Sequence, residues 1–356
     1  MSETLIQSLI GLDKSSRKFN CPRCGKKRFV RMYDFTAKEY LPDEVGRCDR
    51  EGGCGYHMTA KQYFESKGLG YKPKSKEIEI KPEVIDYLPF DFVQQTMKGY
   101  DKNNFVIGYE SLFGNEIAKL SCSEYSIGTS KYQHTHRDFP EYKSATGSTI
   151  FWQIDIDGKV RSGKVILYDA DSFKRVKQPF DHVTWIHTLL KKKGYNLKQC
   201  FFGEYLLSKY PNKTVGILES EKSAIVASIY LPDMVWLATG GSGACLGDSS
   251  VFKVLKGRDV ILFPDFGFYN KETGKTCYQK WEERSERIKE IQQCSITVSR
   301  ILEDELPESD RTKGSDLADY LICRSEGKGW ALEDDNSYPI FWDLLMKIKG
   351  FESTCL

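Results

Sequence analysis

Two pairs of cysteines near the start of the chain have the spacing of metal ligands. Cys21 and Cys24 lie in CPRCG, and Cys48 and Cys54 follow in CDREGGCG. Two residues between thiolates allow one tight turn to present both sulfurs to a tetrahedral Zn²⁺ ion. The second pair is wider, and His57 in CGYH is an alternative to Cys54 as the fourth ligand. We favour Cys54 because GGCG repeats the Cys-Gly form of the first pair.

The segment between the two pairs, KKRFVRMYDFTAKEYLPDEVGR, is predicted to form two strands and a turn. With the cysteines it resembles a zinc ribbon. Such a small module buries too little apolar surface to be stable alone, so we expect the zinc to be structural. Lys27 and Arg28, with aromatic residues beside them, suggest a face that binds single-stranded nucleic acid. A solvated strand face is the alternative interpretation of this charge run.

Two carboxylates in the second half of the chain each follow an apolar, strand-like run. Glu219 lies in VGILESEKSAIVAS, and Asp265 lies in ILFPDFG. If the two strands are neighbours, both acids point into one crevice and can share a hard cation such as Mg²⁺ or Mn²⁺. A single acid at such a position is equally well explained as a charge in the first turn of a helix.

A basic segment precedes these acids. STIFWQIDIDGKVRSGKVILYDADSFKRVK, residues 148–177, is predicted to form a hairpin that turns at DIDG. Basic side chains that could hold phosphates lie on or beside it: Arg161, Lys164, Lys174, Arg175 and Lys177. Phosphate contacts of this kind favour no particular sequence and weaken with salt. The alternative is again a solvated strand face.

The elements that would position these residues alternate along the chain. From residue 214 onward, short β-branched runs take turns with helical patterns, which predicts a parallel α/β sheet flanked by helices. We expect the following organisation: a zinc ribbon over 1–65, a linker over 66–84, a mixed α+β region over 85–205, the α/β domain over 206–325 and an acidic, helical tail over 326–356.

The composition is that of a globular protein. The 356 residues are 40% hydrophobic and 29% charged, with a net charge of +2. No apolar run approaches the roughly 18 residues that span a bilayer, and the first residues lack the features of a secretory signal. We therefore expect a cytoplasmic protein that does not bind membranes, in which the 11 cysteines are thiols or metal ligands.

The α/β part resembles the Toprim domain of primases, topoisomerases and some nucleases. ILESEKSAIVAS resembles the motif with the catalytic glutamate, which implies that role for Glu219, and ILFPDFG resembles the strand with paired aspartates, which implies a metal-binding role for Asp265. GSDLADYLI is similar to the end of the domain in phage-type primases. The order zinc ribbon, basic segment, Toprim domain is that of primases, in which the basic segment holds template and nucleotide phosphates.

Nearly the whole chain also resembles zinc-ribbon and Toprim-like proteins of bacterial mobile elements, through FWQIDIDGKVRSGKV, ESEKSAIVAS and WLATGG. The resemblance implies a primase-like protein that acts on single-stranded DNA or RNA in replication or transfer of such an element, with a helicase acting in trans. Two alternatives remain open: a non-catalytic protein that binds single-stranded nucleic acid, and a metal-dependent nuclease.

The candidate site departs from the Toprim pattern in three places. Gly267 replaces the second aspartate, Ser220 replaces a glycine and Ser223 replaces an acid. We expect Gly267 to serve a sharp turn into an insertion at 268–276. Several acids could restore the lost carboxylate, and spacing does not choose among them: Asp248, Glu272, Asp304, Asp310 and Asp316.

Overall fold

The computed structural model divides the chain into two compact units. One consists of residues 1–83 with 268–276, and the other of residues 84–267 with 277–356. The structure describes residues 4–15, 17–49, 54–69, 75–79, 84–192, 194–241, 249–267, 269, 274–292 and 294–325. Asp248, Glu272 and the expected tail over 326–356 lie outside the described residues.

The N-terminal unit contains an antiparallel sheet built around one long strand, β4 (Lys27–Asp34). The sheet order is β2 (Ile10–Leu12), β4, β6 (Gly46–Cys48) and β7 (His57–Met58), and two short strands, β3 (Phe19–Asn20) and β5 (Glu39–Tyr40), also pair with β4. Helix α1 (Ala60–Ser66) begins at a capping box formed by Thr59 and Gln62. The strands predicted between the cysteine pairs are therefore confirmed.

The expected linker is not free of secondary structure. Strand β8 (Ser75–Glu79) pairs antiparallel with β1 (Thr4–Ser8), so the linker prediction over 66–84 was wrong for these residues. The sequence does carry a strand signal here, because Ile78 and Ile80 alternate with charged residues in KEIEIK, and the interpretation as a linker overlooked it. The partner strand of β8 lies at the other end of the unit's sequence, where no local pattern could reveal the pairing.

The second unit begins with an antiparallel sheet in the order β14 (Val183–Trp185), β11 (Val160–Ile166), β10 (Ser148–Ile154) and β9 (Gly128–Ser130). Strands β10 and β11 form the predicted hairpin, and Gly158 supplies the left-handed residue of its turn with φ of 78°. The remaining elements of this part are α2 (Asp91–Thr96), the 3₁₀ turn η1 (Tyr100–Lys102), α3 (Asn104–Phe113), α4 (Asn115–Glu124), the ribbon β12 (Tyr168–Asp169) and β13 (Lys174–Arg175), α5 (Ile186–Leu189) and α6 (Leu206–Lys209).

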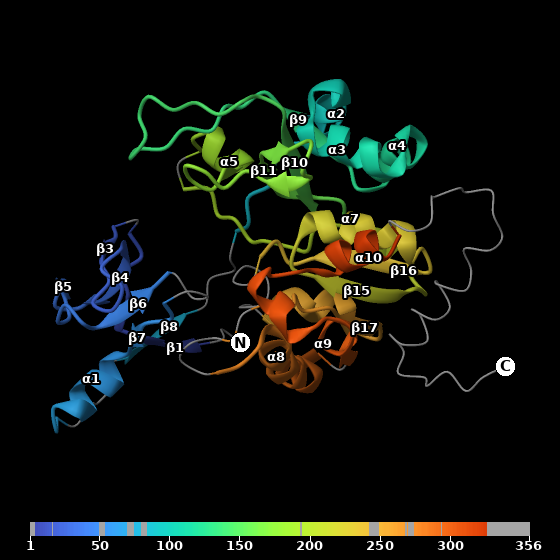
Figure 1. The fold of residues 1–356 in the computed structure, drawn as a ribbon. Helices are drawn as coiled ribbons and strands as arrows, with labels where there is room; N and C mark the ends of the chain where they lie inside the picture. Colours follow the sequence, from blue (N-terminus) through green and yellow to red (C-terminus); the bar gives the residue numbers. More distant parts are fainter. Residues whose placement is uncertain are drawn as a thin grey trace. The chain divides into compact units, whose positions relative to one another are not determined.

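A four-stranded parallel sheet follows, as the alternating pattern predicts. Its order is β16 (Met234–Ala238), β15 (Thr214–Leu218), β17 (Asp259–Leu262) and β18 (Ser295–Val298). Figure 1 shows α7 (Glu221–Tyr230) and α10 (Leu317–Ser325) on one face and α8 (Cys277–Gln292) and α9 (Ile301–Glu305) on the other. Two 3₁₀ helices, η2 (Ser249–Leu255) and η3 (Glu308–Thr312), complete the unit. Because β15 and β17 are neighbours, the condition for bringing Glu219 and Asp265 together is met.

One hydrophobic core extends through both sheets of this unit. It includes Phe105 and Phe151 from the antiparallel part and Trp236 and Phe263 from the parallel part. The regions expected at 85–205 and 206–325 therefore pack together as one unit. Gly216 on β15 makes room for the ring of Trp236 on the neighbouring strand β16, since a Cβ there would lie 2.4 Å from that ring. Within the described part of the chain, no helix is long and apolar enough to cross a membrane.

Candidate functional site

The four predicted cysteine ligands converge in the N-terminal unit. Their Sγ atoms all lie within 4.8 Å of one another, with 3.7 Å between Cys21 and Cys54 and 4.0 Å between Cys24 and Cys48. Four sulfurs placed about 2.3 Å from a tetrahedral Zn²⁺ would be about 3.8 Å apart. The cysteine cluster therefore fits a zinc ion without rearrangement.

Local backbone geometry forms the first half of this cluster. Gly25 has φ of 67° and donates its N–H to the carbonyl of Cys21, which closes the turn between the two cysteines. The backbone N–H of Lys26 is the main reason that the pKa of the Cys24 thiol falls to about 6. The cluster includes Cys54 and leaves out His57, which is exposed on β7. The geometry thus agrees with the choice of Cys54.

The basic residues expected on the zinc ribbon differ in their surroundings. Lys27 and Arg28 are exposed at the start of β4. Phe29, which the sequence grouped with them, is fully buried against the cysteines instead. Only the charged part of the expected nucleic-acid face is therefore available at these positions.

In the second unit, the carboxylates of Glu219 and Asp265 approach each other at the carboxyl ends of adjacent strands. Glu219 follows the last residue of β15, and Asp265 lies just after β17. Phe266 then donates its backbone N–H to the carbonyl of Ser315 at 2.8 Å, and this bridge brings Asp316 beside Asp265. Together with Asp319 on the first turn of α10, these residues form what we call the carboxylate cluster.

The charges in this cluster perturb one another. Burial is the main cause that raises the pKa of Asp265 well above its ordinary value, and the negative charges of Glu219, Asp316 and Asp319 raise it further. Burial also raises the pKa of Glu219, against a hydrogen bond from Trp281 on α8. A divalent cation would relieve this repulsion, so the oxygen ligands and their excess negative charge fit Mg²⁺ or Mn²⁺.

A lysine already lies among these acids. Lys222 Nζ is 3.1 Å from Asp319 Oδ1 and 3.9 Å from Asp316 Oδ2. Ser223, which stands where the Toprim pattern has an acid, donates its hydroxyl to Asp316 Oδ2 at 2.7 Å. Among the described residues, the cysteines are the one group of three or more potential ligands within 4.8 Å. The carboxylates are therefore gathered but not closed around an ion position.

Of the three proposed replacement acids that the structure describes, Asp316 is the one that lies in this cluster. Asp304 forms an ion pair with Arg300 at 3.0 Å, and Asp310 pairs with Lys313 at 2.8 Å. Sequence reasoning missed Asp319 and Lys222. The spacing of Asp316 and Asp319, one helical turn apart in SDLAD, is the signal that could have identified the second acid.

Gly267 occupies a tight turn, in which its N–H is 3.1 Å from the carbonyl oxygen of Asp265. Its φ does not lie in the left-handed region, so the turn itself does not require glycine. A side chain here would be tight, because a Cβ at this position would lie 3.2 Å from Cys277 Sγ on α8. The expectation that the turn explains Gly267 is corrected: the turn does not require glycine, and close packing against Cys277 disfavours a larger residue.

Lys164 does not lie on an open basic surface, contrary to expectation. Its side chain is buried on β11, and Nζ lies 3.0 Å from Glu221 Oε1 and 2.8 Å from the carbonyl of Gly240. Glu221, at the start of α7, is buried as well. Burying either charge alone would be costly, so the two form a structural pair that joins the antiparallel and parallel sheets.

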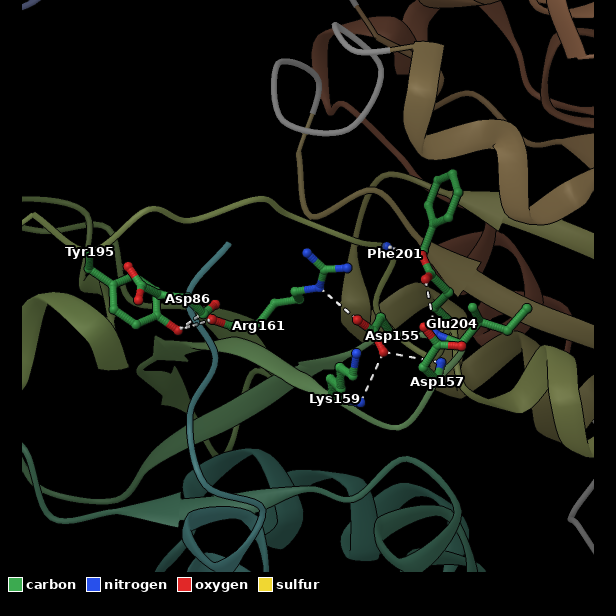
Figure 2. Close-up of polar contacts among 9 residues, drawn as sticks. Asp86, Asp155, Asp157, Lys159, Arg161, Tyr195, Phe201 and Glu204 are labelled. Carbon is green, nitrogen blue, oxygen red and sulfur yellow. Dashed lines mark hydrogen bonds and ion pairs between the residues drawn. The ribbon is translucent and has the colours of Figure 1, made fainter. Parts of the chain in front are cut away.

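Arg161 is also engaged within the protein, as Figure 2 shows. Its Nε is 2.7 Å from Asp155 Oδ2, and its guanidinium lies over the ring of Tyr87 at 4.9 Å. Asp155 is buried and also accepts the backbone N–H of Lys159 at 2.9 Å. Asp155 thereby orders the hairpin turn. The Arg161 side chain is largely buried against it, contrary to the expected exposed phosphate contact.

The neighbouring Glu204 belongs to the same buried region (Figure 2). Its two carboxylate oxygens accept the backbone N–H groups of Ile156 and Phe201, each at 3.1 Å. Burial outweighs these hydrogen bonds and raises the pKa of Glu204 to about 7. Glu204 ties α6 to the hairpin turn and lies on no element that carries the carboxylate cluster.

The other predicted phosphate contacts are exposed. Lys174 and Arg175 form β13, and Lys177 follows it. Arg175 also contributes, with Arg284 and Lys280 of α8, to the positive charge that acts on Glu219. The structure thus brings Arg175 close enough to the carboxylate cluster to influence it electrostatically. Arg161 and Lys164 pair instead with Asp155 and Glu221.

Two family models match parts of the chain. Residues 10–69 match a zinc beta-ribbon finger, and residues 103–266 match a domain of unknown function, DUF6371. No curated protein matches the chain significantly. The first match and the cysteine geometry agree on a zinc-binding ribbon in the N-terminal unit.

Among solved structures, the chain is similar to several primases at low sequence identity. The primase fragment of the bacteriophage T7 primase-helicase is 14% identical, with a TM-score of 0.35 over 91% of this chain and 98% of that chain. The Escherichia coli primase catalytic core is 9% identical, with a TM-score of 0.39 over 73% and 89%. The zinc-binding and RNA polymerase domains of Aquifex aeolicus primase are 13% identical, with a TM-score of 0.38 over 96% and 80%.

Proposed function

We propose that this chain is a primase-like protein that acts on single-stranded DNA in replication or transfer of a mobile element. The observation that carries the proposal is the carboxylate cluster at the carboxyl ends of β15 and β17, where ligands of parallel sheets bind. Metal ions held by carboxylates and substrate phosphates are the usual means of nucleotidyl transfer.

Three carboxylates of this cluster bind the cation in the proposal. Glu219 and Asp265 hold Mg²⁺ or Mn²⁺. Asp316 takes the role of the second Toprim aspartate, whose position is occupied by Gly267. The bound cation supplies charge neutralisation for the triphosphate of an incoming nucleotide. Arg175 lies near Glu219 and is exposed, so it is suited to contact the same phosphates.

The remaining basic residues support binding of the template. Four of them are exposed: Lys174 and Lys177 on the second unit, and Lys27 and Arg28 on the zinc ribbon. Their contacts with phosphates would favour no particular nucleotide sequence. Arg161 and Lys164 are removed from this group because each forms a largely buried ion pair within the protein. We assign the zinc ion a structural role, since its ligands are the core of a small sheet.

Lys222 supports a second candidate, a non-catalytic protein that binds single-stranded nucleic acid. Its ammonium already offsets part of the negative charge of Asp316 and Asp319, as a metal ion would in an active enzyme. Under this alternative, the cluster preserves the fold and binds no divalent cation.

A primer-synthesis assay separates the two candidates. The full chain is incubated with single-stranded template, nucleoside triphosphates and Mg²⁺ or Mn²⁺, beside Glu219→Gln and Asp265→Asn. We expect wild type to extend or form primers and each variant to lose at least about 100-fold of that activity. Asp304→Asn is the matched control, because Asp304 pairs with Arg300 outside the cluster. Equal products from wild type and all variants would contradict the catalytic proposal, and template cleavage in place of synthesis would favour a nuclease.

A further inference from the structure

A run of stacked aromatic rings connects two irregular segments of the second unit. The segments are 131–147, between β9 and β10, and 176–182, after β13 (Figure 1). The rings of Phe139 and Phe180 stack at 5.9 Å with an interplanar angle of 26°, and those of Phe180 and His182 stack at 4.5 Å and 18°. His136 also stacks with Phe180, at 4.9 Å and 28°. We call these four residues the aromatic run.

The inner end of the aromatic run is fixed by hydrogen bonds. His182 is fully buried, with Nδ1 3.1 Å from the carbonyl of Val176 and Nε2 3.2 Å from Tyr142 Oη. His134 packs against it edge-on at 5.5 Å, and its Nε2 lies 3.1 Å from Ser148 Oγ at the start of β10. Segments without regular secondary structure are thereby anchored to the sheet, so the outer rings are held in defined positions.

The outer end of the run faces solvent. Phe139 is 39% exposed, and His136 is exposed as well. An exposed phenylalanine contributes little to folding, and stacked rings that continue to the surface present a π-face to a further planar group. The aromatic run is therefore open to extension by one or more flat, unpaired rings.

The surroundings of the run are positively charged. The ranges 131–147 and 174–182 contain six exposed basic residues: Lys131, Arg137, Lys143, Lys174, Arg175 and Lys177. Three exposed acids lie in the same ranges, namely Asp138, Glu141 and Asp181, which leaves a net charge of three positive. Planar rings flanked by net positive charge match the bases and phosphates of a single nucleic-acid strand.

We propose that the aromatic run is a stacking surface for the bases of single-stranded DNA. A base stacks on Phe139 and continues the order Phe139, Phe180, His182, while the flanking phosphates contact Arg137 and Lys143. The segment that carries Phe180 continues directly from β13, whose Arg175 acts on Glu219. This inference rests on the proposed function, because it supplies the path of the template that leads to the carboxylate cluster.

The proposal distinguishes single strands from duplexes. Bases in a duplex are already stacked on one another, so the ring of Phe139 would offer them nothing, whereas phosphate contacts would be similar in both. Removal of the ring should therefore affect single-stranded DNA alone.

The test measures binding of the full chain to a fluorescent oligonucleotide that contains 2-aminopurine. We expect Phe139→Ala to weaken binding of single-stranded DNA about tenfold and to lose the quenching of 2-aminopurine that reports stacking. Phe139→Trp should retain both. Phe90→Ala is the matched control, since Phe90 is 47% exposed at the start of α2, outside both segments. Duplex DNA and an oligonucleotide of abasic sites should bind wild type and Phe139→Ala equally.

The outcomes separate this inference from the catalytic proposal. Affinity and quenching unchanged in Phe139→Ala would overturn the stacking surface, even if wild type makes primers. A loss of affinity in Phe139→Ala with no primer synthesis by wild type would support the stacking surface and contradict catalysis. Equal loss on abasic DNA, or a loss of self-association in Phe139→Ala without an effect on DNA, would also overturn the proposal.

Discussion

The cysteine cluster and the carboxylate cluster both gather like-charged ligands, but they do so in different ways. The four sulfurs already lie near the edge lengths of a zinc tetrahedron, and three of the cysteines are buried with Phe29 in one hydrophobic cluster of their unit, beside a second around Leu41 and Val45. The carboxylates lie at the edge of a sheet whose core is complete without them, and Lys222 offsets part of their charge. The comparison indicates that one metal would be required for folding, whereas the other would be bound during function.

The largest expected effect is the removal of zinc. Chelation should unfold the N-terminal unit, because structural zinc contributes about 10–16 kcal/mol to the folding of small domains. The second unit has its own hydrophobic core and should stay folded. Hydrogen exchange measured by mass spectrometry checks this, with peptides from 17–49 losing protection and peptides from 214–241 keeping it.

Cys21→Ser should reproduce the effect of the chelator. Cys323→Ser is its matched control, because Cys323 is exposed on α10 and belongs to no ligand group among the described residues. Full protection of residues 17–49 in metal-free protein would contradict a structural role for zinc.

The next effect concerns the stability of the metal-free carboxylate cluster. The pKa of Asp265 is raised in the fold, so its contribution to stability is present below about pH 4 and is lost as the pH rises through the raised value. Asp265→Asn removes this loss and should stabilise the metal-free protein at pH 8, because no carboxylate then has to ionise at this buried position.

Thermal unfolding between pH 4 and pH 8 measures this difference. The gap between variant and wild type should widen with pH and narrow when Mg²⁺ is added to wild type, because the ion favours the ionised cluster. A variant that is less stable than wild type at pH 8 without metal would show that Asp265 stabilises the fold instead.

A smaller effect, on metal affinity, is expected from replacing Lys222. This lysine is a cation placed among the carboxylates. Lys222→Met removes a cation from Asp316 and Asp319, so Mn²⁺ should bind about five- to tenfold more tightly, as measured by electron paramagnetic resonance of free Mn²⁺. Lys119→Met, which alters an exposed pair with Glu116, is the control. Weaker Mn²⁺ binding in Lys222→Met would mean that the lysine orders the site and does not compete with the ion.

The sequence predicts the parts of the molecule that depend on local patterns. The alternating runs predict β15 and β17, and the Cys-Gly pairs predict the zinc ligands, because each signal lies within a few residues. Asp316 could not be chosen from spacing, since the bridge between Phe266 and Ser315 that delivers it joins distant parts of the chain. Tertiary packing also determines which of the predicted basic residues remain exposed, and local charge patterns do not show this.

Lys164 is the clearest case of such a tertiary effect. Its position on a basic hairpin predicts a phosphate contact, but its partner Glu221 lies on another element, and the pairing removes both charges from the surface. Gly267 is similar, because Cys277 on α8 packs closely enough to disfavour a side chain there. Sequence patterns identify charges correctly but do not reveal which of them neutralise one another.

The central claim is that Glu219 and Asp265 bind a divalent cation for nucleotidyl transfer. Anomalous diffraction from crystals soaked with Mn²⁺ and a nucleoside triphosphate tests it most directly, and data at the zinc edge from the same crystals report the cysteine cluster. The account predicts zinc among the four cysteines and Mn²⁺ in contact with Glu219, Asp265 and the triphosphate, and no Mn²⁺ there in Glu219→Gln. Ordered triphosphate with Mn²⁺ away from both carboxylates, and with Lys222 still paired to Asp316 and Asp319, would contradict it.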